Sequence, residues 1–212
     1  MIQISHRGSF AFNLSPFQGD ASGLSRVINF EYDNEVTKPY HYQVDLCNQQ
    51  LHVEFAPSHQ SAIYHFDYKE DKTPSLILNA GNGELELSGN VIYGYQNMWN
   101  NLRVYIYMET EPMKTGTLQS DKWEEGKRKA KGDNTCVVVG WNAAPLSLNV
   151  RYGVSYISVE QAKRNLRREI KDFDLKKVTS AGRKIWNEEL GKISVSGGTE
   201  NDRFVFYTSL YR

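Results

Sequence analysis

The sequence predicts a mainly β protein: an antiparallel β-sandwich followed by C-terminal linker helices. Between about residue 25 and residue 156, apolar residues recur at every second position, as in half-buried strands. Clusters of Gly, Asn, Asp and Pro separate these runs at short intervals, with no helical pattern between them. After residue 157 the apolar period becomes that of a helix. Many short strands at close spacing are typical of a sandwich.

The clearest predicted hairpin joins residues 39–46 to residues 51–55. Both segments, "PYHYQVDL" and "LHVEF", alternate apolar and polar side chains. A two-residue turn at Asn48-Gln49 would fix the register between them. That register places three apolar pairs on one face, namely Leu46 with Leu51, Val44 with Val53, and Tyr42 with Phe55.

Four further segments are predicted strands, and short polar clusters are the predicted turns. The strands are "AIYHFDY" (62–68), "LRVYIYM" (102–108), "TCVVVGW" (135–141) and "LSLNVRYGVSY" (146–156). The turns are "EDKTP" (70–74), "NAGNG" (79–83) and "KGDN" (131–134). Gly, Pro, Asn and Asp favour turns because they tolerate or fix the required backbone angles.

Two helices follow the sandwich. Ser158 and Gln161 have the spacing of a capping box at the start of the first helix. Its apolar stripe consists of Val159, Ala162, Leu166 and Ile170. Asp174 is the predicted N-cap of the second helix, and Gly191 is its predicted end. The stripe of the second helix consists of Leu175, Val178, Ile185, Trp186 and Leu190.

A third helix is predicted to begin at Thr199, which is a suitable N-cap with acidic residues in the following turn. Its apolar residues are Phe204, Tyr207, Leu210 and Tyr211. No Gly or Pro interrupts this stripe before the last residue. An apolar helix face must pack on something, so we expect residues 204–211 to have a partner surface.

Composition narrows the possible functions. The chain has 25 Lys and Arg residues against 25 Asp and Glu residues, which gives no general attraction to nucleic acid or to a membrane surface. No apolar run reaches the length of a membrane span. The basic stretch at 122–131 contains interleaved acidic residues, so a solvated hairpin or loop is favoured over a nucleic-acid site. Cys47 and Cys136 leave a disulfide between them open.

Two groups of residues are candidates for chemistry within the chain. On the outer face of the predicted hairpin, Asp45 lies opposite His52, beside His41 and Glu54. Such residues could bind a transition metal, but a solvated sheet face with a cross-strand Asp–His pair is favoured. No Ser or Cys nucleophile motif is present.

The segment "YGYQNMWNN" combines Tyr93, Tyr95 and Trp99 with three asparagines, a composition that suits a sugar-facing loop. Trp141 is a second tryptophan considered as a sugar platform. The simpler alternative is that Trp99 packs under the loop while the asparagines form turns.

The last sixty residues resemble the segment that joins the two domains of glycoside hydrolase family 92, the calcium-dependent exo-α-mannosidases. The matching positions are Ser158, Val159, Glu160, Ala162, Asn165, Leu166, Glu169 and Ile170, then Trp186, Asn187, Leu190, Ile193, Val195 and Gly197, and then Phe206, Tyr207, Thr208, Leu210 and Tyr211. A weaker resemblance covers "FEYDNEVTKPYHYQVDL". There Tyr32 replaces a histidine that is usual in the family, and Gln60 stands for an arginine further on.

The resemblance implies a sandwich over residues 1–157, a helical linker over 158–198, and the first helix of an (α/α)₆ catalytic barrel over 199–212. It also implies that the whole enzyme hydrolyses terminal α-mannosides, for example α-1,2-linked ones, with inversion and with bound Ca²⁺. The family's acid, base and calcium ligands lie in the barrel, so no catalytic or metal-binding residue is assigned in this chain. Weak similarity of "SHRGSF" to a family motif makes His6 a candidate substrate contact, together with Trp99 and Tyr95.

On this reading the chain supports the catalytic barrel, shapes the substrate pocket and is inactive alone. Family members are usually periplasmic or secreted, so a location outside the cytoplasm follows from the resemblance. Two alternatives stay open: a carbohydrate-binding sandwich that acts without a barrel, and a structural unit that self-associates through residues 204–211.

Overall fold

The computed structural model describes residues 2–6, 9–68, 73–110, 114–119, 122–140 and 147–211. The strands are β1 (Ile2–His6), β2 (Ser9–Gln18), β3 (Tyr32–Lys38), β4 (His41–Leu46), β5 (Leu51–Pro57), β6 (Ser61–Tyr68), β7 (Pro74–Ser88), β8 (Val91–Asn97), β9 (Arg103–Glu109), β10 (Lys114–Gln119), β11 (Lys122–Glu125), β12 (Lys129–Gly140) and β13 (Ser147–Ser155). The helices are α1 (Val159–Glu169), α2 (Leu175–Leu190) and α3 (Glu200–Tyr211). The predicted fold class is confirmed.

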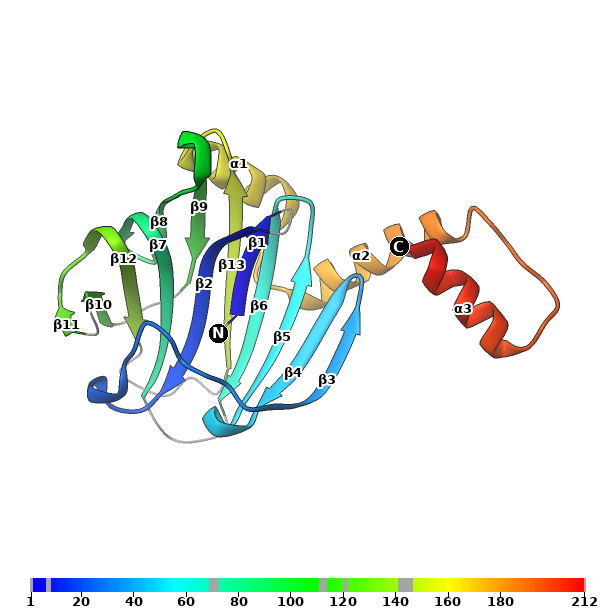
Figure 1. The fold of residues 1–212 in the computed structure, drawn as a ribbon, viewed down its shortest axis with the longest axis horizontal. Helices are drawn as coiled ribbons and strands as arrows, with labels where there is room; N and C mark the ends of the chain where they lie inside the picture. Colours follow the sequence, from blue (N-terminus) through cyan, green and yellow to red (C-terminus); the bar gives the residue numbers. More distant parts are fainter. Residues whose placement is uncertain are drawn as a thin grey trace.

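The strands of the described part form one antiparallel sheet that folds over into two layers (Figure 1). The hydrogen-bonded order is β11-β10-β12-β7-β8-β9-β13-β6-β5-β4-β3, and β2 joins β1 to β7. One edge of β7 pairs with β2 over residues 74–79 and with β8 over residues 83–88. The opposite edge pairs with β12 along residues 75–86. β7 and β12 therefore pass from one layer of the sandwich into the other, as corner strands do.

Glycines allow this change of layer. A Cβ at Gly83 would lie 2.0 Å from the carbonyl oxygen of Tyr95, and one at Gly94 would lie 1.9 Å from that of Glu84. Asn134 adopts a left-handed backbone conformation at the same level of β12, with a φ of 54°. The predicted turns "NAGNG" and "KGDN" are therefore wrong, because both segments lie inside long strands. Glycine and asparagine serve close backbone approach and a left-handed backbone position here, not chain reversal.

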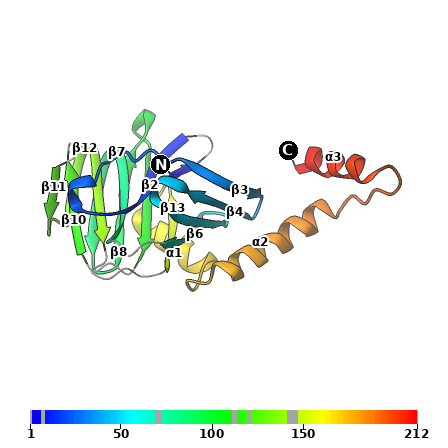
Figure 2. The same cartoon turned by 90° about the horizontal axis from the view of Figure 1, so that it is seen from below.

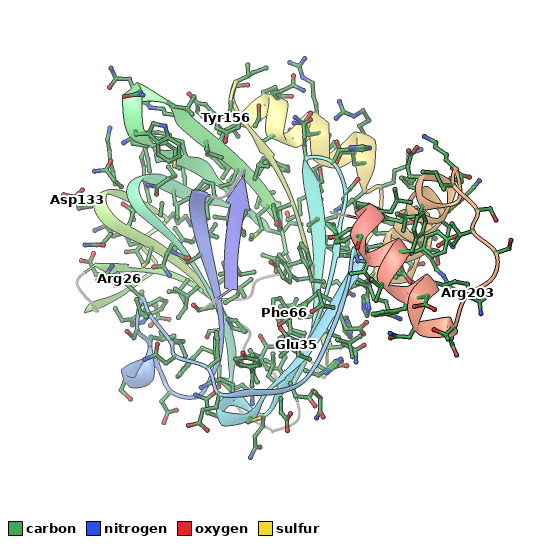
Figure 3. All side chains as sticks on the ribbon, turned by 45° about the vertical axis from the view of Figure 1, so that its right-hand side comes forward. Arg26, Glu35, Phe66, Asp133, Tyr156 and Arg203 are labelled. Atoms are coloured by element: carbon green, nitrogen blue, oxygen red, sulfur yellow. The ribbon has the colours of Figure 1, made fainter. Side chains whose placement is uncertain are left out.

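The core between the two layers is apolar and rich in aromatic residues. Phe66 lies inside it, fully buried (Figure 3). Tyr64 stacks against Phe66 and Tyr152, with ring centroids 5.7 Å and 6.1 Å apart. Burial raises the pKa of the Tyr64 and Tyr152 hydroxyls well above the ordinary range, so both stay protonated. Two smaller clusters cover the outer faces, one beneath α1 and one beneath the loop that contains Leu24 and Ile28.

The predicted hairpin register is confirmed for all three apolar pairs. The connection itself differs from the expected two-residue turn. It is a 3₁₀ turn over Cys47–Gln49, closed by a bond from Gln50 N to Cys47 O, with Gln50 in the left-handed region. A four-residue connection preserves the same pairing because both strands still end opposite one another.

The cysteines occupy different environments. Cys47 is exposed beside the hairpin, whereas Cys136 is buried in β12. The Cys136 thiol is hydrogen-bonded to Asn79 Oδ1, and the Asn79 amide also donates to the Arg26 carbonyl at 2.7 Å. This contact ties the loop that follows β2 to the outer side of the sandwich.

Helix α1 packs on β9 and β13 through the predicted stripe, of which Ala162, Leu166 and Ile170 are buried. Only one of the two hydrogen bonds of the predicted capping box forms. Ser158 Oγ accepts from Gln161 N at 3.1 Å, but the Gln161 side chain donates to Asn165 Oδ1. Asn165 is buried, and its amide donates to the Val154 carbonyl at 2.9 Å, so the helix is fixed to β13 by a hydrogen bond as well.

Helix α2 starts on the sandwich and then leaves it (Figure 2). Asp174 caps it as predicted, accepting from Lys177 N at 3.2 Å, and the helix ends at Gly191. Leu175 is buried at its start, whereas Ile185 is 50% exposed. The apolar stripe is therefore covered by the sandwich only over its first turns.

Helix α3 folds back beside the end of α2, away from the sheets (Figure 2). Thr199 Oγ1 accepts from Asp202 N, and Asp202 Oδ2 accepts from Thr199 N, so the predicted cap is confirmed as a reciprocal pair. The Tyr211 ring lies 5.0 Å from that of Trp186. Phe204 is 69% exposed, so only part of the predicted stripe has a partner in this chain. None of the helices in the described part has the length and apolar character needed to span a bilayer.

The junction between α1 and α2 is fixed by a nearly buried ion pair. Arg151 and Glu109 are each 11% exposed and lie on adjacent strands. Arg151 donates from Nε and Nη2 to Glu109 Oε2, at 3.0 Å and 2.5 Å. Its Nη1 donates to the Ile170 carbonyl at 2.8 Å, and its guanidinium lies over the Phe173 ring. The Arg151 side chain thus connects β9 and β13 to Ile170 and Phe173, which precede α2 and set its direction.

Replacing Gly94 with Ala should destabilise the fold by about 3 kcal/mol, because a Cβ cannot fit beside the Glu84 carbonyl. Gly89→Ala is the matched control, since Gly89 has a positive φ of 59° and no atom within 4 Å of the added Cβ. It should cost only about 1 kcal/mol of backbone strain. Urea unfolding followed by circular dichroism measures both, and equal losses would contradict the close-approach argument.

Replacing Glu109 with Ala should cost about 3–5 kcal/mol, because it leaves the Arg151 guanidinium nearly buried without its counter-ion. Glu109→Leu combined with Arg151→Met should recover most of that loss. The exposed pair Lys184–Glu188 provides the control, and Glu188→Ala should change stability by less than about 0.5 kcal/mol. A small loss for Glu109→Ala in thermal unfolding would show that the ion pair is dispensable.

Candidate functional site

A groove of about 550 Å³ lies where the sandwich meets α2. Its walls come from the β3–β4 turn, the β5–β6 loop, the end of α1 and the first three turns of α2. The lining residues are Pro39, Tyr40, Pro57, Ser58, His59, Glu169, Ile170, Lys171, Asp172, Lys177, Val178, Ala181, Gly182, Ile185 and Trp186. A Cβ at Gly182 would lie 2.8 Å from Tyr40 Cβ, so this glycine allows α2 to approach the turn. The groove is predominantly apolar, with charged groups at its rim.

The carboxylates in this groove are already engaged in ion pairs and hydrogen bonds. Glu169 Oε2 accepts from Gln60 N at 2.8 Å, which fixes the β5–β6 loop to α1. Asp172 Oδ2 accepts from Lys177 Nζ at 2.6 Å, and this bond lowers the pKa of Asp172. A general acid of a glycosidase needs a raised pKa instead. The groove can therefore bind and orient a ligand or a neighbouring domain, and Glu169 and Asp172 are held in place by their neighbours.

The outer face of β4, β5 and β6 carries the predicted histidine–carboxylate pairs. His52 Nδ1 lies 2.6 Å from Asp45 Oδ1, and His41 Nε2 lies 2.7 Å from Glu54 Oε2. His65 lies between Asn149 and Asp67. Within the described ranges, no three His, Cys, Asp or Glu residues converge as metal ligands would. The prediction of a cross-strand Asp–His pair is confirmed.

A second surface lies on the outer side of β12, β7, β8 and β9, next to α1. We call it the outer tyrosine face. It consists of Asn82, Glu84, Glu86, Tyr93, Tyr95, Asn97, Arg103, Tyr105, Lys129, Lys131 and Asp133. Asp133 marks its edge in Figure 3. These residues alternate with buried ones along each strand, so they share one side of the sheet.

The polar side chains of the outer tyrosine face form a chain of hydrogen bonds across four strands. Arg103 Nε donates to Asn97 Oδ1 at 3.0 Å, Asn97 Nδ2 donates to Asn82 Oδ1 at 2.6 Å, and Asn82 Nδ2 donates to Asp133 Oδ1 at 2.5 Å. The Arg103 guanidinium lies 4.2 Å from the centre of the Tyr95 ring. These contacts hold the side chains in fixed positions before any ligand binds.

Ion pairs complete this face at its other end. Glu84 accepts from Lys129 at 2.6 Å and from Lys131 at 3.2 Å, and the bond from Lys129 lowers the pKa of Glu84. Tyr93 Oη donates to Glu86 Oε1 at 2.7 Å, which raises the pKa of Tyr93. Lys127 likewise pairs with Glu124 at 2.8 Å. Lys127, Lys129 and Lys131 all stay exposed, which agrees with the predicted solvated hairpin or loop.

Of the candidate sugar contacts, Tyr95 and Trp99 have described side chains, whereas the side chains of His6 and Trp141 lie outside the described part. Tyr95 belongs to the outer tyrosine face, with its ring 6.0 Å from that of Tyr105. Trp99 starts the 3₁₀ turn between β8 and β9 and is 59% exposed. His6 ends β1, and its side chain is outside the described part of the structure. Trp141 also lies outside the described residues.

The turn that presents Trp99 is built by asparagines, as the simpler alternative predicted. Asn100 and Asn101 both have positive φ, at 55° and 58°. Met98 N donates to the Leu102 carbonyl at 2.8 Å and closes the turn. The other half of that alternative is wrong: Trp99 is not packed under the loop, because more than half of it is exposed. Its contact with sugar stays a prediction.

The sequence interpretation missed Arg103, Asn82 and Asp133 as members of one surface. The segments that contain Asn82 and Asp133 were predicted to be turns, and a turn has no partner strand from which a shared surface could be inferred. The available signal was Arg103, which lies near the start of a predicted strand and two residues before Tyr105, on the same side of that strand. Arg151 and Glu109 were missed as well, because their pairing depends on the order of β9 and β13 in the sheet.

Solved structures share this fold over nearly the whole chain. The family GH92 inverting mannosidase BT2199 of Bacteroides thetaiotaomicron superposes with a TM-score of 0.84 at 24% identity, covering 94% of this chain and 29% of that protein. The family GH92 α-mannosidase BT3965 of the same organism superposes with a TM-score of 0.83 at 18% identity, covering 96% of this chain and 31% of that protein. At these identities the likeness establishes the fold.

A curated relative is similar in sequence. It is described as an uncharacterized secreted glycosidase of Arthroderma benhamiae, and it is 22% identical over 88% of this chain and 29% of its own length. The chain thus spans about three tenths of the relatives that it matches.

Two family models match the chain in succession. The glycosyl hydrolase family 92 N-terminal domain matches residues 4–155, which are the sandwich. The glycosyl hydrolase family 92 catalytic domain matches residues 161–212, which contain α2, α3 and all but the first two residues of α1. The first match alone covers more than half of the chain, and it agrees with the sandwich topology described above. This chain therefore belongs to glycosyl hydrolase family 92.

Proposed function

We propose that this chain is the N-terminal part of an α-mannosidase that hydrolyses terminal α-mannosides, such as α-1,2-linked ones, with inversion. Family membership supports a glycosidase acting on glycans. The fold neighbours described as GH92 mannosidases, one of them inverting, support the finer assignment.

The observation that carries the role of this chain is the set of exposed apolar residues on α2, on α3 and on the link between them. Its exposed members are Ile185, Ile193, Phe204, Val205, Leu210 and Tyr211. This surface lies within the residues that match the family's catalytic domain. We infer that the rest of an (α/α)₆ catalytic domain covers it, since large apolar patches normally mark an interaction surface.

The sandwich would then form one wall of the substrate pocket rather than carry out the chemistry. The groove beside α2 gathers Tyr40, His59 and Trp186, and the Trp186 ring lies 5.0 Å from the Tyr211 ring of α3. Aromatic rings and a histidine suit the positioning of a sugar ring, whereas the engaged carboxylates of the groove do not suit proton transfer. We assign no catalytic residue within this chain.

The expected Ca²⁺ does not fit the described residues. Calcium prefers six to eight oxygen ligands, often with several carboxylates among them. The described ranges hold no group of three or more His, Cys, Asp or Glu residues that could bind a metal ion. We propose that its ligands come from the remainder of the catalytic domain.

The secreted relative supports export of this protein as well. We propose action outside the cytoplasm, either in the periplasm or after secretion. An exported glycosidase would meet its glycans there directly.

The chain alone should not hydrolyse α-1,2-mannobiose, whereas the complete protein should release mannose. Inversion predicts that the first product is the β-anomer, because water attacks the face opposite the leaving group. Proton NMR of the anomeric signals during the first minutes measures this outcome. Addition of EDTA should abolish release and Ca²⁺ should restore it, and an α-anomer formed first would overturn the inverting assignment.

The isolated chain should self-associate through residues 204–211, because Phe204 and Val205 are 69% and 54% exposed. Phe204→Asp should shift sedimentation from larger species to the monomer. Arg203→Asp, one residue away on the same helix, is the matched control and should have little effect. A monomer at all concentrations would contradict this prediction and would indicate that the exposed apolar area is too small for association without the catalytic domain.

A further inference from the structure

We propose that the outer tyrosine face, together with Trp99, is an accessory binding surface for a neutral oligosaccharide. It lies on the sandwich, separate from the groove beside α2, and goes beyond the proposed catalytic role. The two surfaces are divided by α1, which covers β9 and β13. Binding there requires no catalytic group.

The strand register arranges this face in rows. Lys131, Glu84, Tyr95 and Tyr105 form one row across four strands. The next row contains Lys129, Glu86, Tyr93 and Tyr107, of which Tyr107 is covered by α1. Neighbouring strands repeat about every 4.8 Å, so the charged groups on β12 and β7 and the rings on β8 and β9 follow one another at a short, regular spacing. An extended chain of similar units can match such a surface at several points.

The chemistry of these rows suits sugar hydroxyls. Carboxylate, amide and phenol groups supply both donors and acceptors, which a polyhydroxylated ligand needs. The bonds from Arg103 through Asn97 to Asn82 hold these groups in place, so little ordering is required on binding. Trp99 is 59% exposed in the turn between Asn97 of β8 and Arg103 of β9, where its ring can offer an apolar plane to the C–H face of a sugar ring.

The charges on this face argue for a neutral ligand. Three basic residues, Arg103, Lys129 and Lys131, are matched by three acidic ones, Glu84, Glu86 and Asp133. The two lysines are already paired with Glu84. A nucleic acid or an acidic glycan would need an excess of positive charge, which the face lacks.

Isothermal titration of the 212-residue chain with α-1,2-mannotriose tests the proposal. Wild type should bind, and Trp99→Ala and Tyr95→Ala should each weaken binding at least tenfold. Tyr32→Ala is the matched control, since Tyr32 is 63% exposed but lies on the distant strand β3, and it should bind like wild type. Thermal unfolding of each variant verifies that the fold is retained.

Ionic strength separates this binding from electrostatic attraction. Affinity for the trisaccharide should change less than twofold between low and high salt, because no net charge is neutralised. No binding at millimolar trisaccharide, equal losses in Tyr32→Ala and Trp99→Ala, or a preference for an acidic glycan would each overturn the proposal. Failure of hydrolysis by the complete protein would leave the titration result unchanged, so the two proposals can fail separately.

Discussion

The close approach of backbones at the middle of β7 is the constraint on which the rest of the structure depends. Gly83 and Gly94 let neighbouring strands meet where any side chain would collide with a carbonyl group. Because of this approach, β7 can pair with β2 in one layer and with β8 in the other. The enclosed core and the outer tyrosine face both follow from that change of partner.

The outer side of the sheet at β8, β9 and β13 is divided into two parts with different roles. One part of its outer side is covered by α1 and fixed by the Arg151–Glu109 pair. The remainder is polar, satisfied by its own hydrogen bonds and open to solvent. The polar surface and the exposed apolar residues of α2 and α3 are therefore separate, and neither interrupts the core.

Local patterns sufficed to predict much of this fold. The register of β4 and β5 follows from alternation on both sides of one short connection, and the caps at Ser158, Asp174 and Thr199 follow from residue type and spacing. The interior of β7 could not be predicted in this way. In the sequence, glycine and asparagine mark a turn and a site of close backbone approach alike, and only the partner strand distinguishes the two situations. The surface that joins Asn82, Asn97 and Asp133 was hidden for the same reason.

Helix α2 acts mechanically as a beam clamped at one end. Its sixteen residues extend about 24 Å from a base whose direction is fixed at Ile170 and Phe173. A tilt of about 10° at that base would move the far end by about 4 Å, given this length. The stiffness of the Arg151 contact, together with the packing of Leu175 and of Gly182 against Tyr40, thus determines how accurately whatever follows α2 is aligned with the sandwich.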